Sequence, residues 1–429
     1  MVGKDSPAGS ETRLMAIDTL QHPGTVTRPA APLTREEILA GLPEVVAQVA
    51  QGAAEREREG RLPHELFAML RGTGLTWLRV PRSLGGPGGS HADQVEITAS
   101  IASADSGVAH ALRTHFGFLE SIALDPQGET SRRFVGDVLA GKLFGGANME
   151  IGTPRPNMIR TTLLREGDHY RLNGHKYYAT GAIFADYLSF SAIDEEGDPT
   201  GVMIPAGREG VDVRDDWDGM GQRLSASGSV FLDNVRVEPE ELHFRRGKVD
   251  PFIRRHGAVR AQLHLMAVVA GIARNVLSDA VAYVQGQARS AKHSASETAR
   301  GDHFVQRTVG DIAALSHTID ALIAEAGRRL DASQAAILAN APNLDEVVLA
   351  AQLANSKGQV MIGQLALRAA ELLFDTGGGS ATSRGRNFDR HWRNARTLCN
   401  HNPAALRARV IGDYALNGVR ADFDEGRVF

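Results

Sequence analysis

Two histidines, His115 and His401, are the candidates for acid–base chemistry in this 429-residue chain, because histidine titrates near neutral pH. His110 and His115 lie five residues apart on a predicted helix, so they do not share one face of it. Their spacing also differs from the i, i+4 pair of a helical zinc site, and no H-E-x-x-H sequence occurs. We therefore expect no metal site.

The single cysteine, Cys399, allows neither an intramolecular disulfide nor a thiolate metal centre. A chain with only one cysteine is typical of a reducing compartment, and we expect a cytoplasmic protein. A net charge of -4 gives no reason to expect nucleic-acid binding. No apolar run approaches the ~18 residues needed to span a bilayer. The longest candidate, residues 263–273, suits a buried helix, so we expect no membrane contact.

The glycine-rich sequences do not match the common nucleotide-binding loops. None carries the Lys-Ser/Thr of a phosphate loop, and none is a G-x-G-x-x-G between a strand and a helix. The run Gly377-Gly378-Gly379-Ser380 follows a predicted helix instead. It is either a helix C-cap with a turn or a backbone surface that approaches a cofactor closely.

The pattern of the chain predicts three folded regions after a tail. Residues 1–33 are rich in Pro, Gly, Ser and Thr, and we interpret them as a mobile tail. Residues 34–143 read as helices, opened by the capping box Thr34-Arg-Glu-Glu37. One predicted helix begins near Ser106 and runs through His115.

Residues 144–245 change to short alternating segments, near 169–172, 187–191, 201–204 and 229–232. Predicted turns at Asn173-Gly174, Glu196-Gly197 and Asp233-Asn234 separate them, which indicates an antiparallel β domain. Residues 246–429 return to long Ala-rich helices near 256–285, 304–330 and 343–373, as in a four-helix bundle. The fold class is therefore α+β and mostly helical.

Three segments resemble the acyl-CoA dehydrogenase superfamily, in the same order along the chain. They are LPHEL at 62–66 with GLTWLRVP at 74–81, NGHKYYATG at 173–181, and DRHWRNAR at 389–396. The resemblance covers nearly the whole chain beyond the tail. It implies an N-terminal helical domain, a middle β-barrel or sandwich, and a C-terminal four-helix bundle.

Further segments resemble one branch of that superfamily, the dibenzothiophene monooxygenases. These are WDGMGQRLSASG at 217–228, HNP at 401–403 and GDYALNG at 412–418. The branch consists of two-component monooxygenases that use reduced flavin, and some of them oxidise organosulfur compounds.

One absence supports this branch. Common acyl-CoA dehydrogenases place a glutamate base between the glycine-rich loop and the arginine segment, and the matching position here is Gly385. Glycine cannot act as a base, and no acidic residue lies between Asp375 and Asp389. A base on another helix is an alternative, although within residues 256–285 only Asp279 is acidic.

The resemblance implies which residues surround the flavin. Thr180 matches the hydroxyl placed against flavin N5. A hydroxyl both donates and accepts hydrogen bonds, so it can bond N5 in its protonated and its unprotonated state. Tyr178 matches the aromatic that packs on the isoalloxazine ring, and Asn148 lies where the flavin-contacting loop begins. Each also has a purely structural interpretation. Thr180 would be an ordinary strand threonine, Tyr178 a core aromatic residue, and Asn148 the cap of a turn. His115 and His401 match active-site histidines, against the alternative of satisfied core or surface residues.

The resemblance also implies a site completed by oligomerisation. Arg289 matches an arginine that reaches the flavin phosphate of a neighbouring subunit, since the planar guanidinium bonds two phosphate oxygens. Gly379, Ser380 and Thr382 match donors from the same neighbour. The implied assembly is a homotetramer.

These expectations lead to one hypothesis and two alternatives. We expect an FMN-dependent monooxygenase that forms a C4a-hydroperoxyflavin from reduced FMN and dioxygen and oxidises a small or aromatic substrate, with an organosulfur compound as the favoured class. A separate flavin reductase would supply the reduced FMN, by transient contact. The alternatives are an FAD-dependent acyl-CoA dehydrogenase or oxidase with a relocated base, and a non-catalytic scaffold that binds a ligand. The role of Arg113 stays open between an anionic partner and solvent.

Overall fold

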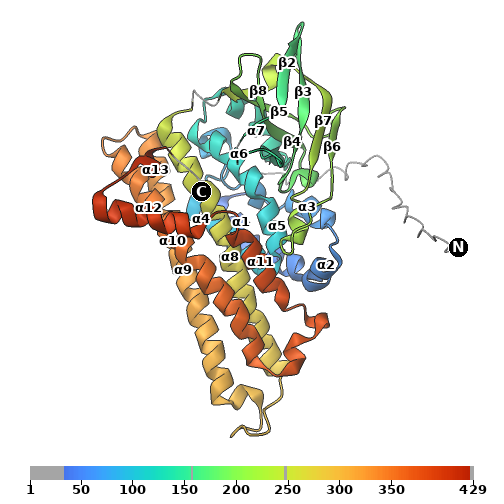
Figure 1. Cartoon of the computed structure of the whole chain (residues 1–429), viewed down its shortest axis with the longest axis vertical. Coiled ribbons are helices and arrows are strands. Elements are labelled where there is room, and N and C mark those ends of the chain that lie inside the picture. The colour runs from blue at the N-terminus through green and yellow to red at the C-terminus, as the bar shows by residue number, and fades with distance from the viewer. Residues whose placement is uncertain (1–32, 156–157, 246–248, 426–429) are drawn as a thin grey trace, which may run out of the picture.

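The computed structural model describes residues 33–155, 158–245 and 249–425. Figure 1 shows a sheet domain at one end, short helices beside it, and a bundle of long helices that extends away from both. The predicted tail lies outside the described residues except for Leu33.

The N-terminal region is helical, as expected. Thr34 caps the first helix: its hydroxyl accepts a hydrogen bond from Glu37 N at 3.2 Å, and the Glu37 carboxylate accepts one from Thr34 N at 2.8 Å, which confirms the capping box. The helices are α1 (Arg35–Ala50), α2 (Ala53–Glu59), α3 (His64–Leu70), α4 (His91–Ala104), α5 (Ser106–Ala111), α6 (Arg113–Leu124) and α7 (Glu129–Leu139).

The prediction of one continuous helix from Ser106 through His115 is wrong. α5 ends at Ala111, and α6 begins at Arg113. Gly181 of the middle domain packs against this junction so closely that a Cβ on it would lie 2.1 Å from the carbonyl oxygen of Ala111. The break therefore brings His110 and Arg113 to a junction that faces the sheet domain.

The middle region forms an eight-stranded sheet in the order β6-β7-β3-β2-β4-β5-β8, with β1 paired in parallel to β4. The pairs β2–β3, β3–β7, β4–β5, β5–β8 and β6–β7 are antiparallel. The strands are β1 (Phe144–Ala147), β2 (Thr162–Glu166), β3 (His169–Lys176), β4 (Tyr187–Ile193), β5 (Pro199–Pro205), β6 (Val211–Val213), β7 (Val230–Val237) and β8 (Leu242–Arg245).

Two of the three predicted turns in this region are wrong. Asn173-Gly174 lies inside β3, and Asp233-Asn234 lies inside β7. Gly174 is needed for close packing, because a Cβ there would lie 2.3 Å from Thr161 Oγ1. Gly197 does occupy the predicted turn between β4 and β5, with φ at +83°.

The C-terminal region contains the long helices. They are α8 (Pro251–Gly286), α9 (His303–Leu338) and α10 (Leu344–Leu372), followed by α11 (Asp389–Cys399), α12 (Ala404–Asn417) and α13 (Ala421–Asp424). α8 is long and apolar enough to cross a membrane by composition, yet every residue from 262 to 273 is buried inside the protein. This burial is typical of the central helix of a bundle.

The two helical regions share one hydrophobic core, although the sheet domain separates them in the sequence. Buried residues of α1 and α4, such as Val49 and Ile101, belong to the same cluster as Val268 of α8 and Ile323 of α9. The sheet has its own core, around Leu172, Phe190 and Val235. The helical regions therefore form one packed body on which the sheet domain sits.

Candidate active site

The turn after β3 carries two of the predicted flavin residues. Tyr178 has a left-handed backbone (φ +57°), and its residue is 51% exposed, with the ring edge-on to Trp217 at 6.0 Å. Thr180 is buried two residues later, and Gly181 (φ +74°) presses against the end of α5. Because the Tyr178 ring is exposed and its backbone conformation is uncommon, Tyr178 fits a surface that faces a ligand better than it fits a position in the core.

A chain of hydroxyls runs inward from Thr180. Thr180 Oγ1 and Ser227 Oγ are 2.8 Å apart, as are Ser227 Oγ and Ser225 Oγ. Ser225 donates its hydrogen to the carbonyl oxygen of Gln222 at 2.7 Å. Because a hydroxyl has one hydrogen, Ser227 must donate to Ser225, and Thr180 must donate to Ser227. The free lone pairs of Thr180 therefore make it a hydrogen-bond acceptor toward any bound ligand.

Asn148 lies just beyond β1 and is exposed. Its Oδ1 accepts a hydrogen bond from Ser191 Oγ at 2.8 Å, which leaves the Nδ2 group to donate. Behind it, Lys176 Nζ donates to Glu150 Oε1 at 2.6 Å in a fully buried ion pair that holds this loop on the sheet. The structure thus presents Asn148 as a donor on the same domain as Thr180 and Tyr178.

His115 does not fit an acid–base role. It is buried at 2% exposure; its Nε2 donates to the carbonyl oxygen of Thr76 at 2.6 Å, and its Nδ1 accepts from Phe144 N at 3.2 Å. Both ring nitrogens are therefore occupied by backbone groups, and burial lowers the pKa of His115 to about 4. The alternative of a satisfied core histidine, which joins α6 to β1, describes His115 better.

His110 is the histidine that approaches the hydroxyl chain. Its Nδ1 lies 3.1 Å from Gln222 Oε1, while Gln222 Nε2 donates to Ser106 Oγ at 3.0 Å. His110 Nδ1 therefore carries the proton, and its buried Nε2 has no partner among the described residues. The sequence analysis named His115 and His401 as the acid–base candidates and assigned no role to His110, Gln222 or Ser227. The segment 217–228 contained a signal for them, because it carried the branch resemblance.

His401 meets Arg113 beside a pocket. Arg113 Nη1 donates to His401 Nε2 at 3.2 Å, so the other ring nitrogen of His401 carries the proton. Desolvation and the Arg113 charge lower the pKa of His401 to about 4, although the residue is exposed at the pocket rim. The pocket, of about 170 Å³, lies between α8, α10 and α11, and its walls include Leu265, Met266 and His401. This places a neutral histidine next to a space large enough for a small molecule.

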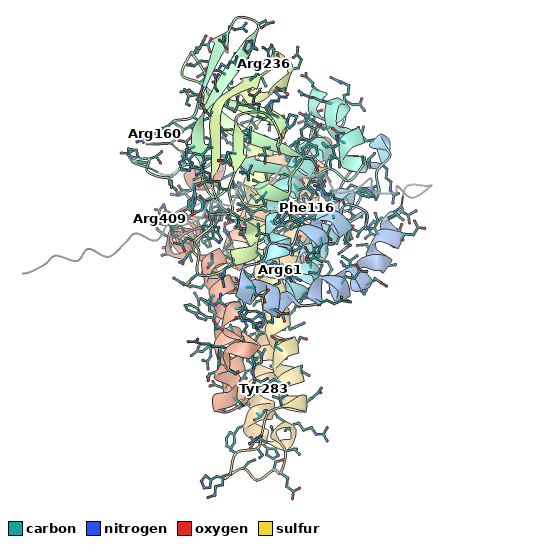
Figure 2. The ribbon with its side chains drawn as sticks, turned by 90° about the vertical axis from the view of Figure 1, so that its right-hand side faces the viewer. Arg61, Phe116, Arg160, Arg236, Tyr283 and Arg409 are labelled. Atoms are coloured by element: carbon teal, nitrogen blue, oxygen red, sulfur yellow. The ribbon has the colours of Figure 1, made fainter. Side chains whose placement is uncertain are left out.

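The remaining predicted residues gather far from this site. Ser380 Oγ is 2.8 Å from the hydroxyl of Tyr283, which Figure 2 labels low on the helical bundle, away from the sheet. Gly379 and Thr382 are exposed beside it, in a short 3-10 turn where Thr382 Oγ1 donates to the Gly379 carbonyl at 2.7 Å. Arg289 is exposed just beyond α8 and has no partner among the described residues.

The structure therefore divides the predicted site residues into two groups. The first comprises Tyr178, Thr180 and Asn148 on the sheet domain, together with His401, which lies close enough to His110 to affect its pKa. The second lies at the distal end of the bundle, with Arg289 and the loop 377–382. One chain does not bring the two groups together.

Acid is expected to destabilise the protein from about pH 6.5 downward. Burial lowers the pKa of His91 and His110 to about 3 and that of His115 and His391 to about 4. Below ~6.5, the usual histidine pKa, the unfolded chain binds protons that the folded chain does not, so stability falls as pH falls. Each histidine contributes up to about 1.4 kcal/mol per pH unit between ~6.5 and its folded pKa.

Urea unfolding at pH 8, 7, 6 and 5 measures this effect. The midpoint should be nearly constant between pH 8 and 7 and should drop steeply between pH 6 and 5. An unchanged midpoint at pH 5 would show that these histidines are protonated in the folded protein.

Comparison with known proteins supports a common origin along most of the chain. Family models for the acyl-CoA dehydrogenase N-terminal, middle and C-terminal domains match residues 35–142, 149–235 and 263–405. The probable FMNH2-dependent monooxygenase SfnC of Pseudomonas putida is 31% identical over 405 residues, which cover 92% of this chain and 97% of that protein. A dibenzothiophene monooxygenase of Rhodococcus erythropolis is 30% identical over 378 residues, covering 85% and 90%.

A solved structure agrees. FMN-bound TdsC from Paenibacillus sp. A11-2 superposes with a TM-score of 0.82 at 28% identity, over 89% of this chain and 98% of that one.

Proposed function

This chain belongs to the acyl-CoA dehydrogenase family, and from that membership we propose that it is a monooxygenase that uses reduced FMN and dioxygen to oxidise a small organosulfur compound. The observation that carries the proposal is the match to SfnC over 97% of that protein's length. The geometry around Thr180 supports it independently of the comparison.

The residues around Thr180 fit a flavin in its reduced state. Bound reduced FMN supplies two electrons and the means to activate dioxygen. Reduced flavin carries a hydrogen on N5, and the acceptor lone pairs of Thr180 suit that hydrogen, since Thr180 already donates to Ser227. Tyr178 and Trp217 offer aromatic surface for the ring, and the free Nδ2 of Asn148 can donate to a ring carbonyl.

The other residues of the site control water and protons. Ala111 and Gly181 close the space behind Thr180 by direct packing. His401 is neutral at pH 7, with its Nε2 bonded to Arg113 and its ring also bonded to the Asn402 side chain, so we propose that its N–H turns from Asn402 to the substrate when one binds.

The acyl-CoA dehydrogenase alternative finds no available base at Gly385 or Asp279, the two positions that the sequence offered for one. Gly385 is exposed in a 3-10 turn at the distal end of the bundle. Asp279 accepts hydrogen bonds from Arg390 Nη2 at 2.7 Å and from His391 Nε2 at 2.8 Å, so its carboxylate is committed to an ion pair. The exposed Tyr178 and the unpaired Arg289 also favour a cofactor-binding enzyme over a non-catalytic scaffold.

Removing the hydroxyl of Ser225 tests the directed hydroxyl chain. In Ser225→Ala, Ser227 loses its acceptor and becomes free to donate to Thr180, which can then turn its own hydrogen toward the flavin. We expect the affinity for reduced FMN to fall by about tenfold relative to that for oxidised FMN, the value of about one hydrogen bond. Anaerobic and aerobic FMN titrations measure the two constants. An equal loss of both affinities would indicate only a packing role for Ser225.

We propose that a second copy of the chain supplies the phosphate site and that the assembly is a homotetramer. The support is the separation of the two residue groups, together with exposed apolar side chains at Phe304, Leu338 and Leu416. Such side chains on long helices are typical of surfaces that another subunit covers. Light scattering after size exclusion measures the assembly.

Arg289→Gln is then expected to weaken FMN binding by about 10- to 100-fold, because a charge-assisted phosphate contact is lost. The affinity for riboflavin, which has no phosphate, should not change, and Arg132→Gln on exposed α7 serves as the control. Equal weakening for both flavins would place Arg289 away from the phosphate.

The activity itself is tested with purified protein, reduced FMN, ¹⁸O₂ and a panel of sulfides, sulfones and sulfinates. One ¹⁸O atom in the product supports the proposal, and hydrogen peroxide as the sole product across the panel contradicts it. We propose that a separate flavin reductase supplies reduced FMN without a stable complex and that the protein works in the cytoplasm, for which the single Cys399 is the support.

A further inference from the structure

Arg113 is a half-buried cation that has no carboxylate partner among the described residues. Its Nε donates to the carbonyl oxygen of Ala261 at 3.3 Å, and its Nη1 donates to His401 Nε2 at 3.2 Å. Both acceptors are uncharged. Burial, with a contribution from Arg260, lowers the pKa of Arg113 to about 10. Taking a guanidinium out of water without a carboxylate is costly, so such a group normally has a partner.

The most deeply buried arginines among the described residues follow that rule. Each of three arginines with 3–4% exposure has a carboxylate partner: Arg56 with Asp105 at 2.9 Å, Arg79 with Glu120 at 2.8 Å, and Arg255 with Asp345 at 2.6 Å. Within the described residues, Arg113 has none. The difference indicates that its partner is not part of the chain.

The groups around Arg113 contribute positive charge but no negative charge. The guanidinium of Arg260 lies against Gly117, one helical turn after Arg113 on α6, and Arg260 Nη1 has no acceptor among the described residues. His401 is neutral: its Nε2 accepts from Arg113, and its ring also bonds the side chain of Asn402. His110 is buried and neutral. In the described part of the chain, no carboxylate lies close enough to shift the pKa of Arg113, His110 or His401.

We propose that Arg113 binds the anionic group of the substrate and that this enzyme therefore takes a small organosulfur anion, such as a sulfinate, in preference to a neutral sulfide, sulfone or thiophene. The guanidinium keeps its Nη2 for an oxyanion, since its Nε and Nη1 are the atoms that donate to Ala261 and His401. The choice of an organosulfur anion rests on the proposed function, whereas the preference for an anion rests on Arg113 alone.

The chemistry of a sulfinate is compatible with this site. The sulfur lone pair of RSO₂⁻ forms the new S–O bond with one atom of dioxygen, while FMNH2 supplies two electrons and two protons that release the other atom as water. The products are RSO₃⁻, FMN and H₂O. The charge on the substrate stays at −1 throughout, so one arginine serves both substrate and product.

Calorimetric titrations in the presence of saturating FMN test the proposal. The probes are methanesulfinate, its unreactive analogue methanesulfonate, and neutral dimethyl sulfone, and the proteins are wild type, Arg113→Gln, Arg113→Lys and the exposed control Arg132→Gln. We expect both anions to bind the wild type at least tenfold more tightly than the sulfone. Arg113→Gln should lose about 10- to 100-fold in anion affinity. Arg113→Lys, which keeps the charge if glutamine impairs folding, should retain the preference for anions.

Three results would overturn the proposal. The first is equal binding of the anions and the sulfone by the wild type, and the second is unchanged anion binding in Arg113→Gln. The third is a loss of affinity in Arg113→Gln that affects only the binding of reduced FMN. The last would mean that Arg113 serves the negative charge of the reduced flavin instead. Anion binding that depends on Arg113, without any oxygenated product, would uphold the anion site and count against the proposed monooxygenase function alone.

Discussion

Replacing Glu120 by glutamine is expected to lower the free energy of unfolding by about 3–5 kcal/mol, the usual cost of breaking a buried ion pair. Glu120 is 4% exposed; its Oε2 accepts from Arg79 Nη2 at 2.8 Å, and its Oε1 accepts from His256 Nε2 at 3.0 Å. Although burial opposes ionisation, His91 and Arg79 hold the pKa of Glu120 well below its usual range. Glutamine keeps the shape but leaves the Arg79 charge buried and unpaired.

The Glu120 cluster joins the two helical regions, which explains why the effect should be global. Glu120 comes from α6 and His256 from α8, while Arg79 also donates to Gln334 of α9 at 2.9 Å. Urea unfolding measures the change, with the exposed Glu209→Gln as the matched control. A loss below about 1 kcal/mol, the range of exposed pairs, would contradict the assignment of this cluster as a central buried contact.

The same cluster does not favour a metal ion. His91, Glu120 and His256 offer ligand atoms within 4.8 Å of one another. However, Arg79 Nη2 lies 2.9 Å from His91 Nε2 and donates to the Glu120 carboxylate, so a guanidinium charge already occupies the space between them. A cation added there would be repelled by Arg79.

Replacing His401 by alanine is expected to reduce the rate of substrate oxygenation by about 10²- to 10⁴-fold, the usual contribution of a positioned acid–base group. The neutral ring accepts a hydrogen bond from Arg113 and lines the pocket, and we infer that its N–H donates to a bound substrate. Reduced FMN should still bind and react with dioxygen, because Thr180, Tyr178 and Asn148 are untouched. Hydrogen peroxide should therefore replace the oxygenated product.

Paired measurements of product and peroxide separate the possible roles of His401. His317→Gln, on an exposed face of α9, is the control and should leave the ratio of product to peroxide unchanged. An unchanged ratio in His401→Ala would mean that His401 does not act on the substrate. A loss of FMN binding would assign it to the cofactor site instead.

Much of the fold could be predicted from local patterns. The capping box at Thr34 and the helices α8, α9 and α10 were predictable because end-capping and apolar periodicity depend on residues close in sequence. Four strands of the middle domain, β3, β4, β5 and β7, followed from their alternation in the same way, whereas β1, β2, β6 and β8 were not predicted. The turns assigned at Asn173-Gly174 and Asp233-Asn234 were wrong, because close packing against Thr161 explains Gly174 better than turn chemistry does.

The candidate site was predictable only in part. The sequence by itself determined the family resemblance, the absence of a base at Gly385 and the residue types at Thr180, Tyr178 and Arg289. Only the tertiary structure decided that His115 is a core residue, since both its partners are backbone groups, Thr76 and Phe144, that lie 39 and 29 residues away.

Tertiary structure also decided the direction of the hydroxyl chain and the isolation of Arg113. Ser225 and Gln222, more than 40 residues later in the chain, determine that the Thr180 hydroxyl donates its hydrogen to Ser227. The neighbour of Arg113 is His401, 288 residues later. Residue types and short-range spacing carry information about what a side chain can do. Which group it meets is determined by long-range packing, and that packing fixes where each proton and charge lies.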